Sequence, residues 1–253
     1  MPARTAPKVR TKADARRVLA VPRFAQPDDV SCGPTCLLQV YRYWGDPVPF
    51  DEIRAATRRN PDGGTLAVYL GLSALARGYR ARIYPFDPDV FDPTWAALGA
   101  RGLRKKLLLA AQAAEGAKSR TQILAYEEFL AAGGEVVLTE LTRRLLVAIL
   151  ERGRPILTGL SATWLYRQAR EDPDTNEVDD VRGRPAGHFV VVCGYGGGGT
   201  SFVLRDPQSH VPMRRTGRYT VPASRLTNSI LLGASTYDSD LLEIWPAGRR
   251  RPR

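Results

Sequence analysis

The architecture of this chain is best deduced from one segment, Gln26-Pro-Asp-Asp-Val-Ser-Cys32-Gly-Pro-Thr-Cys36-Leu-Leu-Gln-Val-Tyr-Arg-Tyr-Trp44. Pro34 suits the first turn of a helix, because its missing N–H costs no hydrogen bond there. Apolar residues then recur at helical spacing as far as Trp44, and Gly45-Asp46-Pro47 ends the pattern. The segment therefore predicts a helix with one buried face, with Cys32 just ahead of its N-terminus.

The position of Cys32 gives its thiol a chemical role. The helix dipole and the unpaired N–H groups of the first turn favour an anion, so they lower the pKa of a nearby thiol. Because the thiolate is the attacking form of cysteine, Cys32 is a candidate nucleophile. The alternative is a buried structural thiol, since free cysteine is among the most buried residue types. We expect Cys36 and Cys193 to serve packing only.

A cysteine nucleophile also needs a base and a group that orients the base. His188 opens an apolar run, residues 188–195, that is typical of a buried strand, and a glycine turn and a second strand follow and end at Asp206-Pro207. Mirror counting about Gly197 and Gly198 places residue 189 opposite residue 206. His188 and Asp206 then lie diagonally across a hairpin, within reach of each other. The other histidine, His210, is expected in an exposed turn.

These positions resemble the papain-like cysteine peptidases, and more narrowly the bacteriocin-processing, double-glycine-leader peptidases and their stand-alone bacterial relatives. The resemblance rests on Gln26 followed by Cys32-Gly-Pro, the late His188 on a strand, and Asp206-Pro207 after the next strand. It implies Cys32 as nucleophile, His188 as general base and acid, and Asp206 as the orienting residue. It also implies that Gln26 donates its amide to an oxyanion hole. The expected fold is α+β, with the nucleophile helix packed on an antiparallel sheet that carries His188 and Asp206.

Other functions remain open at this stage. An acyl or peptidyl transferase would use the same residues with an amine or thiol in place of water. A catalytically idle peptide-binding or maturation protein would use the same scaffold. Such a protein has no need of all four residues, Gln26, Cys32, His188 and Asp206. A zinc site from the three cysteines and His188 is disfavoured, because His188 and Cys193 face opposite sides of a regular strand. We therefore expect a peptide or protein substrate, no metal and no cofactor.

The composition excludes several classes of protein. The chain has 253 residues, of which 43% are hydrophobic, and this is typical of a globular domain. A net charge of +11 invites a nucleic-acid interpretation, but the arginines are scattered and no nucleic-acid motif accompanies them. Three cysteines make no disulfide framework. With no signal peptide and no apolar run of membrane-spanning length, we expect a cytoplasmic protein.

The expected organisation is a flexible basic arm over 1–20, one peptidase-like domain over 21–246 and a basic tail over 247–253. Residues 87–135 are a possible helical insertion, which either shapes a substrate groove or packs as plain helices. Helices are predicted over 49–59, 65–77, 93–114, 121–132, 139–152 and 219–226, and strands over 21–25, 79–86, 156–160, 230–232 and 240–245. The acidic run 170–180 before His188 suits a lid over the site, a site for a basic substrate segment, or a solvated loop without a partner.

Overall fold

The computed structural model describes residues 15–248 except 62, 174, 176, 213, 215 and 237. Most of the expected arm 1–20 and of the tail 247–253 therefore lies outside the described residues. The helices are α1 (Cys32–Tyr43), α2 (Phe50–Ala56), α3 (Ala67–Ala76), α4 (Ala100–Ala113), α5 (Ala117–Ala131), α6 (Arg143–Glu151), α7 (Ala162–Tyr166) and α8 (Ala223–Leu231), with short 3₁₀ turns η2 (Pro93–Ala97), η3 (Gly197–Gly199) and η4 (Leu232–Ser235). The strands are β1 (Arg17–Val18), β2 (Tyr79–Tyr84), β3 (Glu135–Val136), β4 (Ile156–Ser161), β5 (Gly187–Gly196), β6 (Ser201–Arg205), β7 (Arg218–Pro222) and β8 (Leu241–Pro246).

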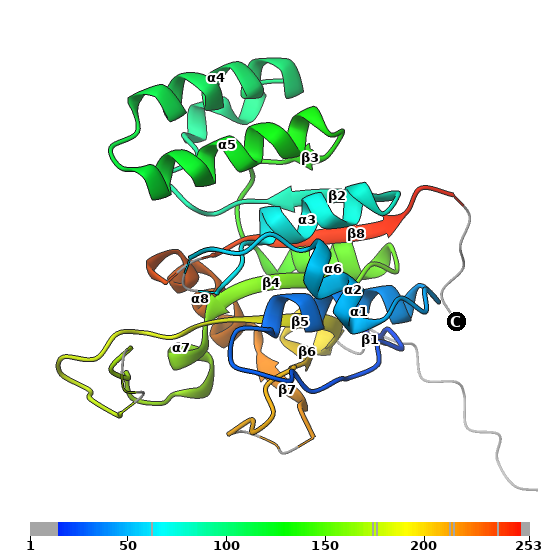
Figure 1. The fold of residues 1–253 in the computed structure, drawn as a ribbon. Helices are drawn as coiled ribbons and strands as arrows, with labels where there is room; N and C mark the ends of the chain where they lie inside the picture. The colour runs from blue at the N-terminus through cyan, green and yellow to red at the C-terminus, as the bar shows by residue number, and fades with distance from the viewer. Residues whose placement is uncertain are drawn as a thin grey trace, which may run out of the picture.

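One sheet runs through the molecule in the order β3-β2-β8-β4-β5-β6-β7, with β1 paired to β5 (Figure 1). The expected α+β fold is confirmed. The sheet is mixed, because β3 pairs parallel to β2, whereas every pair around β4, β5 and β6 is antiparallel. Within the expected arm, Arg17 and Val18 form β1 and pair with Tyr195 and Gly194 of β5.

The central strands are covered on both faces. Every residue of β4 is buried, and β5 is buried from His188 to Tyr195. An unbroken apolar run of this kind is expected where a strand has packed elements above and below it. Helix α1 packs against β5, and α8 packs against β4. The start of β5, which carries His188, is therefore buried between packed elements.

Three predicted elements are wrong. Residues 21–25 form no strand, because Pro22 has no N–H to donate and side chains hold this segment instead. Residues 219–226 are not a helix from their start, since Tyr219 belongs to β7 and the helix begins only at Ala223. Residues 230–232 form the end of α8 and the start of η4 rather than a strand. In each case the apolar segment is too short for its spacing alone to distinguish a strand from a helix or a loop, and the tertiary contacts determine the outcome.

The block 87–135 is built around a pair of helices, α4 and α5, which lie at the top of Figure 1 above β2. Helix α5 packs on α3 through the fully buried ring of Phe129. A Cβ atom on Gly71 would lie 2.7 Å from that ring, and one on Gly134 would lie 2.4 Å from it. The two glycines therefore form the slot that receives Phe129 and attaches the helical pair to the domain.

We predict that Phe129→Ala lowers the free energy of unfolding by about 3–5 kcal/mol, because it leaves a cavity in this slot. Leu124→Ala on the same helix is the matched control, since the Leu124 side chain is 40% exposed. It should change stability by no more than about 0.5 kcal/mol. Urea unfolding measures both variants. Equal effects of the two substitutions would mean that the helical pair is not anchored at Phe129.

Candidate active site

The loop that precedes α1 is fixed by Asp28. The carboxylate of Asp28 accepts hydrogen bonds from the Ser31 hydroxyl (2.5 Å) and the Val30 N–H (3.2 Å). Ser31 is the N-cap residue of α1, yet its side chain makes no capping hydrogen bond, because the hydroxyl is directed to Asp28. The first N–H groups of α1 thus have no side-chain cap. They remain available to a negative charge at the position of Cys32.

Pro34 lies in the first turn of α1, as the sequence predicts, whereas Cys32 is the first residue of the helix rather than the residue just ahead of it. One turn further along, the thiol of Cys36 is fully buried and donates a hydrogen bond to the Phe189 carbonyl (3.3 Å). Residues four apart lie on the same face of a helix. The contact between Cys36 and Phe189 therefore sets Cys32 beside the start of β5, where His188 precedes Phe189. Cys193, in β5, is also buried.

His188 and Asp206 are in direct contact, with 2.9 Å between Nε2 of the ring and Oδ1 of the carboxylate. The hairpin register differs from mirror counting, because the turn spans more residues and a bulge lies between Val192 and Gly194. Val191 pairs with Arg205, so the register continued by one residue sets Asp206 opposite residue 190. Residues 188 and 190 point to the same face of the strand. The shift thus brings His188 and Asp206 onto one face.

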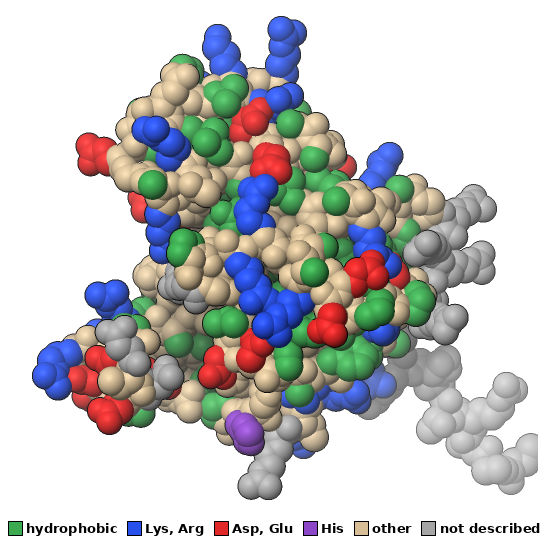
Figure 2. Space-filling view, in the orientation of Figure 1, with side chains coloured by type: hydrophobic (Ala, Val, Ile, Leu, Met, Phe, Trp, Pro, Cys, Tyr) green, Lys and Arg blue, Asp and Glu red, His purple; other side chains and the backbone are tan. Residues whose placement is uncertain are grey.

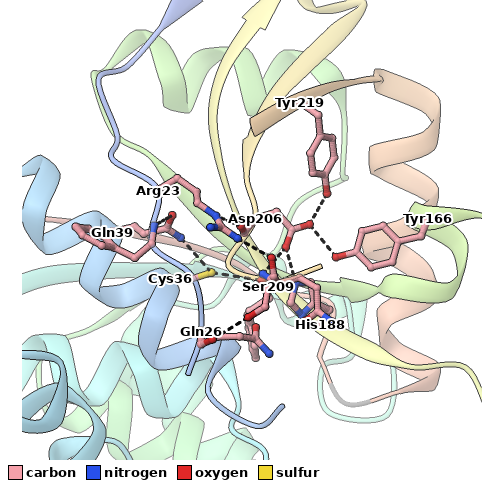
Figure 3. A network of polar contacts seen from close by, with 12 residues as sticks. Arg23, Gln26, Cys36, Gln39, Tyr166, His188, Asp206, Ser209 and Tyr219 are labelled. Atoms are coloured by element: carbon pink, nitrogen blue, oxygen red, sulfur yellow. Dashed lines mark hydrogen bonds and ion pairs between the residues drawn. The ribbon is translucent and has the colours of Figure 1, made fainter. Parts of the chain in front are cut away.

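Asp206 is fully buried, and its carboxylate accepts four hydrogen bonds (Figure 3). Oδ1 accepts from His188 and from the Gln208 N–H at 2.9 Å. Oδ2 accepts from the hydroxyl groups of Tyr166 at 2.8 Å and Tyr219 at 2.5 Å. A buried carboxylate needs such donors to stay ionised. The four donors hold Asp206 as an anion in a fixed orientation toward the ring.

The pKa shifts of the three groups point to a charged arrangement. Burial alone would raise the pKa of the Cys32 thiol, but its hydrogen bond and charge interaction with His188 outweigh burial and lower the pKa. Burial alone would lower the pKa of His188, but the Asp206 carboxylate raises it to about 10. Burial likewise opposes ionisation of Asp206, but His188 and Tyr219 keep its pKa below the usual carboxyl range. The three shifts therefore all favour the charged forms, which are the Cys32 thiolate, the His188 imidazolium and the Asp206 carboxylate.

Gln26 lies between the loop before α1 and the loop after Asp206. Its N–H donates to the Pro207 carbonyl (2.7 Å), and its carbonyl accepts from the Ser209 hydroxyl (3.0 Å; Figure 3). The Gln26 side chain is buried, and its Nε2 donates to the Asp28 carbonyl at 2.9 Å. That bond uses one of the two amide hydrogens. Gln26 thus links the loop before α1 to the loop after Asp206 and keeps one amide hydrogen free of these bonds.

Three residues that support Asp206 are not identified by the sequence analysis. Arg23 donates to the carbonyls of Asp206 (2.9 Å) and Gln208 (2.6 Å), which joins residues 21–26 to the Asp206 loop in place of the expected strand. Tyr166 and Tyr219 come from α7 and β7, far from each other in the chain. The one available signal is Tyr219-Thr-Val221, which is typical of a strand and which the helix prediction missed.

Two other candidate features lie at the surface. The acidic run 170–180 forms an exposed loop at the lower left of Figures 1 and 2, where carboxylates gather beside basic side chains. Within it, Asp179 pairs with Arg182 at 2.8 Å, and Arg170 donates to the Asp180 carbonyl at 2.5 Å. The loop therefore offsets part of its own charge, and its role as a lid stays a prediction. His210 is exposed, as the sequence predicts.

Within the described residues, no group of three or more histidine, cysteine or acidic side chains is arranged to hold a metal ion. Among the helices of the same described ranges, none combines the length and the apolar character needed to cross a bilayer.

No family model and no curated protein matches the chain. Among solved structures, it is similar to a double-glycine-motif protease from an AMS/PCAT transporter in complex with its leader peptide (16% identity, TM-score 0.43, covering 91% of this chain and 94% of that one). It is also similar to a putative C39-like peptidase from Bacillus anthracis (15%, 0.47, 94% and 100%) and to the peptidase domain of Streptococcus ComA (14%, 0.42, 89% and 98%). These similarities concern the fold alone.

The hydrogen bonds from the two tyrosine hydroxyls to Asp206 should stabilise the fold in a pH-dependent way. Tyr166→Phe and Tyr219→Phe should each lower the free energy of unfolding by about 1.5–3 kcal/mol at pH 7, because each removes a hydrogen bond to a buried charge. These donors favour the ionised form of Asp206. Their contribution is therefore present above the unfolded-state pKa and is lost as the pH falls through the lowered folded-state pKa.

Urea unfolding at pH 7 and at pH 3 measures this dependence. Tyr195→Phe is the matched control, since its hydroxyl bonds the carboxylate of the half-exposed Glu151. The control should cost less than about 1 kcal/mol at pH 7. A cost for Tyr166→Phe and Tyr219→Phe no larger than that of the control would contradict the proposed support of Asp206.

Proposed function

We propose that this protein is a cysteine peptidase that cleaves a peptide or amide bond through Cys32, His188 and Asp206. The observation that carries the proposal is the buried pair of His188 and Asp206 at the start of β5, against the N-terminus of α1. The lowered thiol pKa of Cys32 and the raised pKa of His188 support the same assignment. Both shifts are those that an activated thiol nucleophile requires.

In the first half of the reaction, the Cys32 thiolate attacks the carbonyl carbon of the scissile bond and forms a tetrahedral oxyanion. The N–H of Cys32, which has no acceptor within its helix, is one proposed donor to this oxyanion. The second amide hydrogen of Gln26 is the other. His188 then gives its proton to the leaving nitrogen, the C–N bond breaks, and a thioester remains on Cys32.

In the second half, neutral His188 accepts a proton from water, and the hydroxide attacks the thioester carbon. The C–S bond breaks, the acid product leaves, and the thiolate and imidazolium are restored. Because Nε2 of His188 is held by Asp206, the ring atom that exchanges these protons is Nδ1. Asp206 remains ionised throughout and stabilises the imidazolium.

The experiment is an incubation of the protein with a peptide library made by digesting a bacterial proteome, with mass spectrometry of the new termini. The wild type is expected to generate new termini, and Cys32→Ala to generate none. Gln26→Ala should lower the turnover rate by about 10²–10³-fold, because it removes an oxyanion donor. Cys193→Ala, which alters a thiol away from the proposed reaction, is the control and should remain active.

Two results would contradict the proposal. One is the same set of new termini from wild type and Cys32→Ala, since the cleavage would then come from elsewhere. The other is a library left intact by wild-type protein whose Cys32 is reduced and whose fold is verified by circular dichroism.

A further inference from the structure

A hollow of about 540 Å³ lies between α7 and α8, and none of the proposed catalytic residues lines it. Arg167 and Gln168, which directly follow α7, form part of its wall, and Arg225 and Asn228 of α8 form another part. Trp164 of α7, which is 50% exposed, adds an apolar side. Hydrogen-bond donors thus converge on a space large enough for an amino-acid side chain and its neighbours.

The charge of the hollow is uncompensated. Two arginines line it, and no aspartate or glutamate does. Nε of Arg225 is buried and has no hydrogen-bond partner, and among the described residues neither guanidinium forms an ion pair. In the acidic loop 170–180, Asp179 pairs with Arg182 and so is not a counterion for Arg167 or Arg225. Neither guanidinium is therefore already paired with a carboxylate of the chain, and both line a space that an anion can enter.

The backbone at the hollow is also unusual. Arg167 has φ 57° and ψ 44°, and it is the only non-glycine residue with positive φ in the described chain. A side chain in this left-handed conformation costs free energy and often marks a binding site. Here the conformation ends α7 and puts Arg167 in the wall of the hollow.

Helix α7 connects the hollow to the proposed active site. Tyr166, next to Arg167 in the chain, donates to the Asp206 carboxylate. Thr163, which lines the hollow, accepts a hydrogen bond from the N–H of Ala186, two residues before His188 (2.9 Å). The helix is five residues long and spans about 7.5 Å. Helix α7 is thus in contact with both the hollow and the proposed active site.

We propose that this hollow binds an oxyanion and, resting on the peptidase function proposed above, that the oxyanion is the carboxylate of an aspartate or glutamate side chain in the peptide substrate. A guanidinium pairs with a carboxylate through two parallel hydrogen bonds. The amides of Gln168 and Asn228 supply further donors. Because the hollow and the proposed nucleophile are both fixed in the fold, the acidic residue is expected at a constant position relative to the scissile bond.

Direct binding tests the oxyanion site without any turnover. Isothermal titration calorimetry on the Cys32→Ala protein uses three probes, which are acetyl-(Glu)₄-amide, acetyl-(Gln)₄-amide and inorganic phosphate. We expect the glutamate peptide to bind and the glutamine peptide not to bind. Arg167→Gln and Arg225→Gln should each weaken glutamate-peptide binding by about tenfold or more. Arg101→Gln, on the exposed start of α4, is the matched control and should leave it unchanged.

The two sources of an oxyanion are separated by the phosphate arm. If the site serves a peptide, phosphate binds more weakly than the glutamate peptide and competes with it. Phosphate binding that depends on Arg167 and Arg225, without glutamate-peptide binding, would overturn the substrate assignment. Equal binding of the glutamate and glutamine peptides, or equal effects of the Arg225→Gln and Arg101→Gln substitutions, would overturn the oxyanion site itself.

The peptide-library experiment then connects the hollow to cleavage. Sites cut by the wild type should be enriched in aspartate or glutamate at one position relative to the new terminus. Arg167→Gln should remove the enrichment while cleavage of non-acidic peptides continues. Cleavage without any acidic preference would overturn the proposed specificity and leave the peptidase function standing. Arginine-dependent peptide binding without cleavage would instead contradict the peptidase function alone.

Discussion

The buried carboxylate of Asp206 is the interaction on which the arrangement of this molecule depends. It receives hydrogen bonds from His188 on β5, Tyr166 on α7 and Tyr219 on β7, while its own carbonyl is bound by Arg23. An ion in a protein interior is stable only when donors replace the water it has lost. Three separate parts of the chain are therefore held together by the requirement to satisfy one charge, and Arg23 adds a fourth at the peptide carbonyl of Asp206.

This requirement also shapes the local backbone. Gly217 has φ +60°, and a Cβ atom there would lie 2.5 Å from the Asp206 carbonyl oxygen and 2.4 Å from Nε of Arg23. Its carbonyl accepts the N–H of Asp206 at 2.8 Å. Only glycine allows the chain to pass so close in that conformation. The negative charge of Asp206 raises the pKa of His188, and His188 in turn lowers the pKa of the Cys32 thiol.

The sequence predicts the parts of the site that depend on local signals. Pro34 and the apolar spacing after it define α1, and the strand-glycine-strand pattern brings His188 near Asp206. The sequence does not predict the register, because the bulge next to Cys193 is set by the packing of β5 and β1. It also misses Tyr166, since the contact of α7 with Asp206 spans 40 residues and has no local pattern. The roles proposed for the site residues in catalysis remain predictions.

The most direct measurement is the pH dependence of iodoacetamide alkylation, mapped by mass spectrometry to the three cysteines, in the wild type and in His188→Ala. We predict that Cys32 alone reacts rapidly well below a pH of about 8.5. The pKa of a free thiol is about 8.5, and His188 lowers it at Cys32. We also predict that His188→Ala abolishes this reactivity at low pH, while buried Cys36 and Cys193 stay unreactive in both proteins. A Cys32 that reacts only at alkaline pH, like an ordinary thiol, would contradict the account.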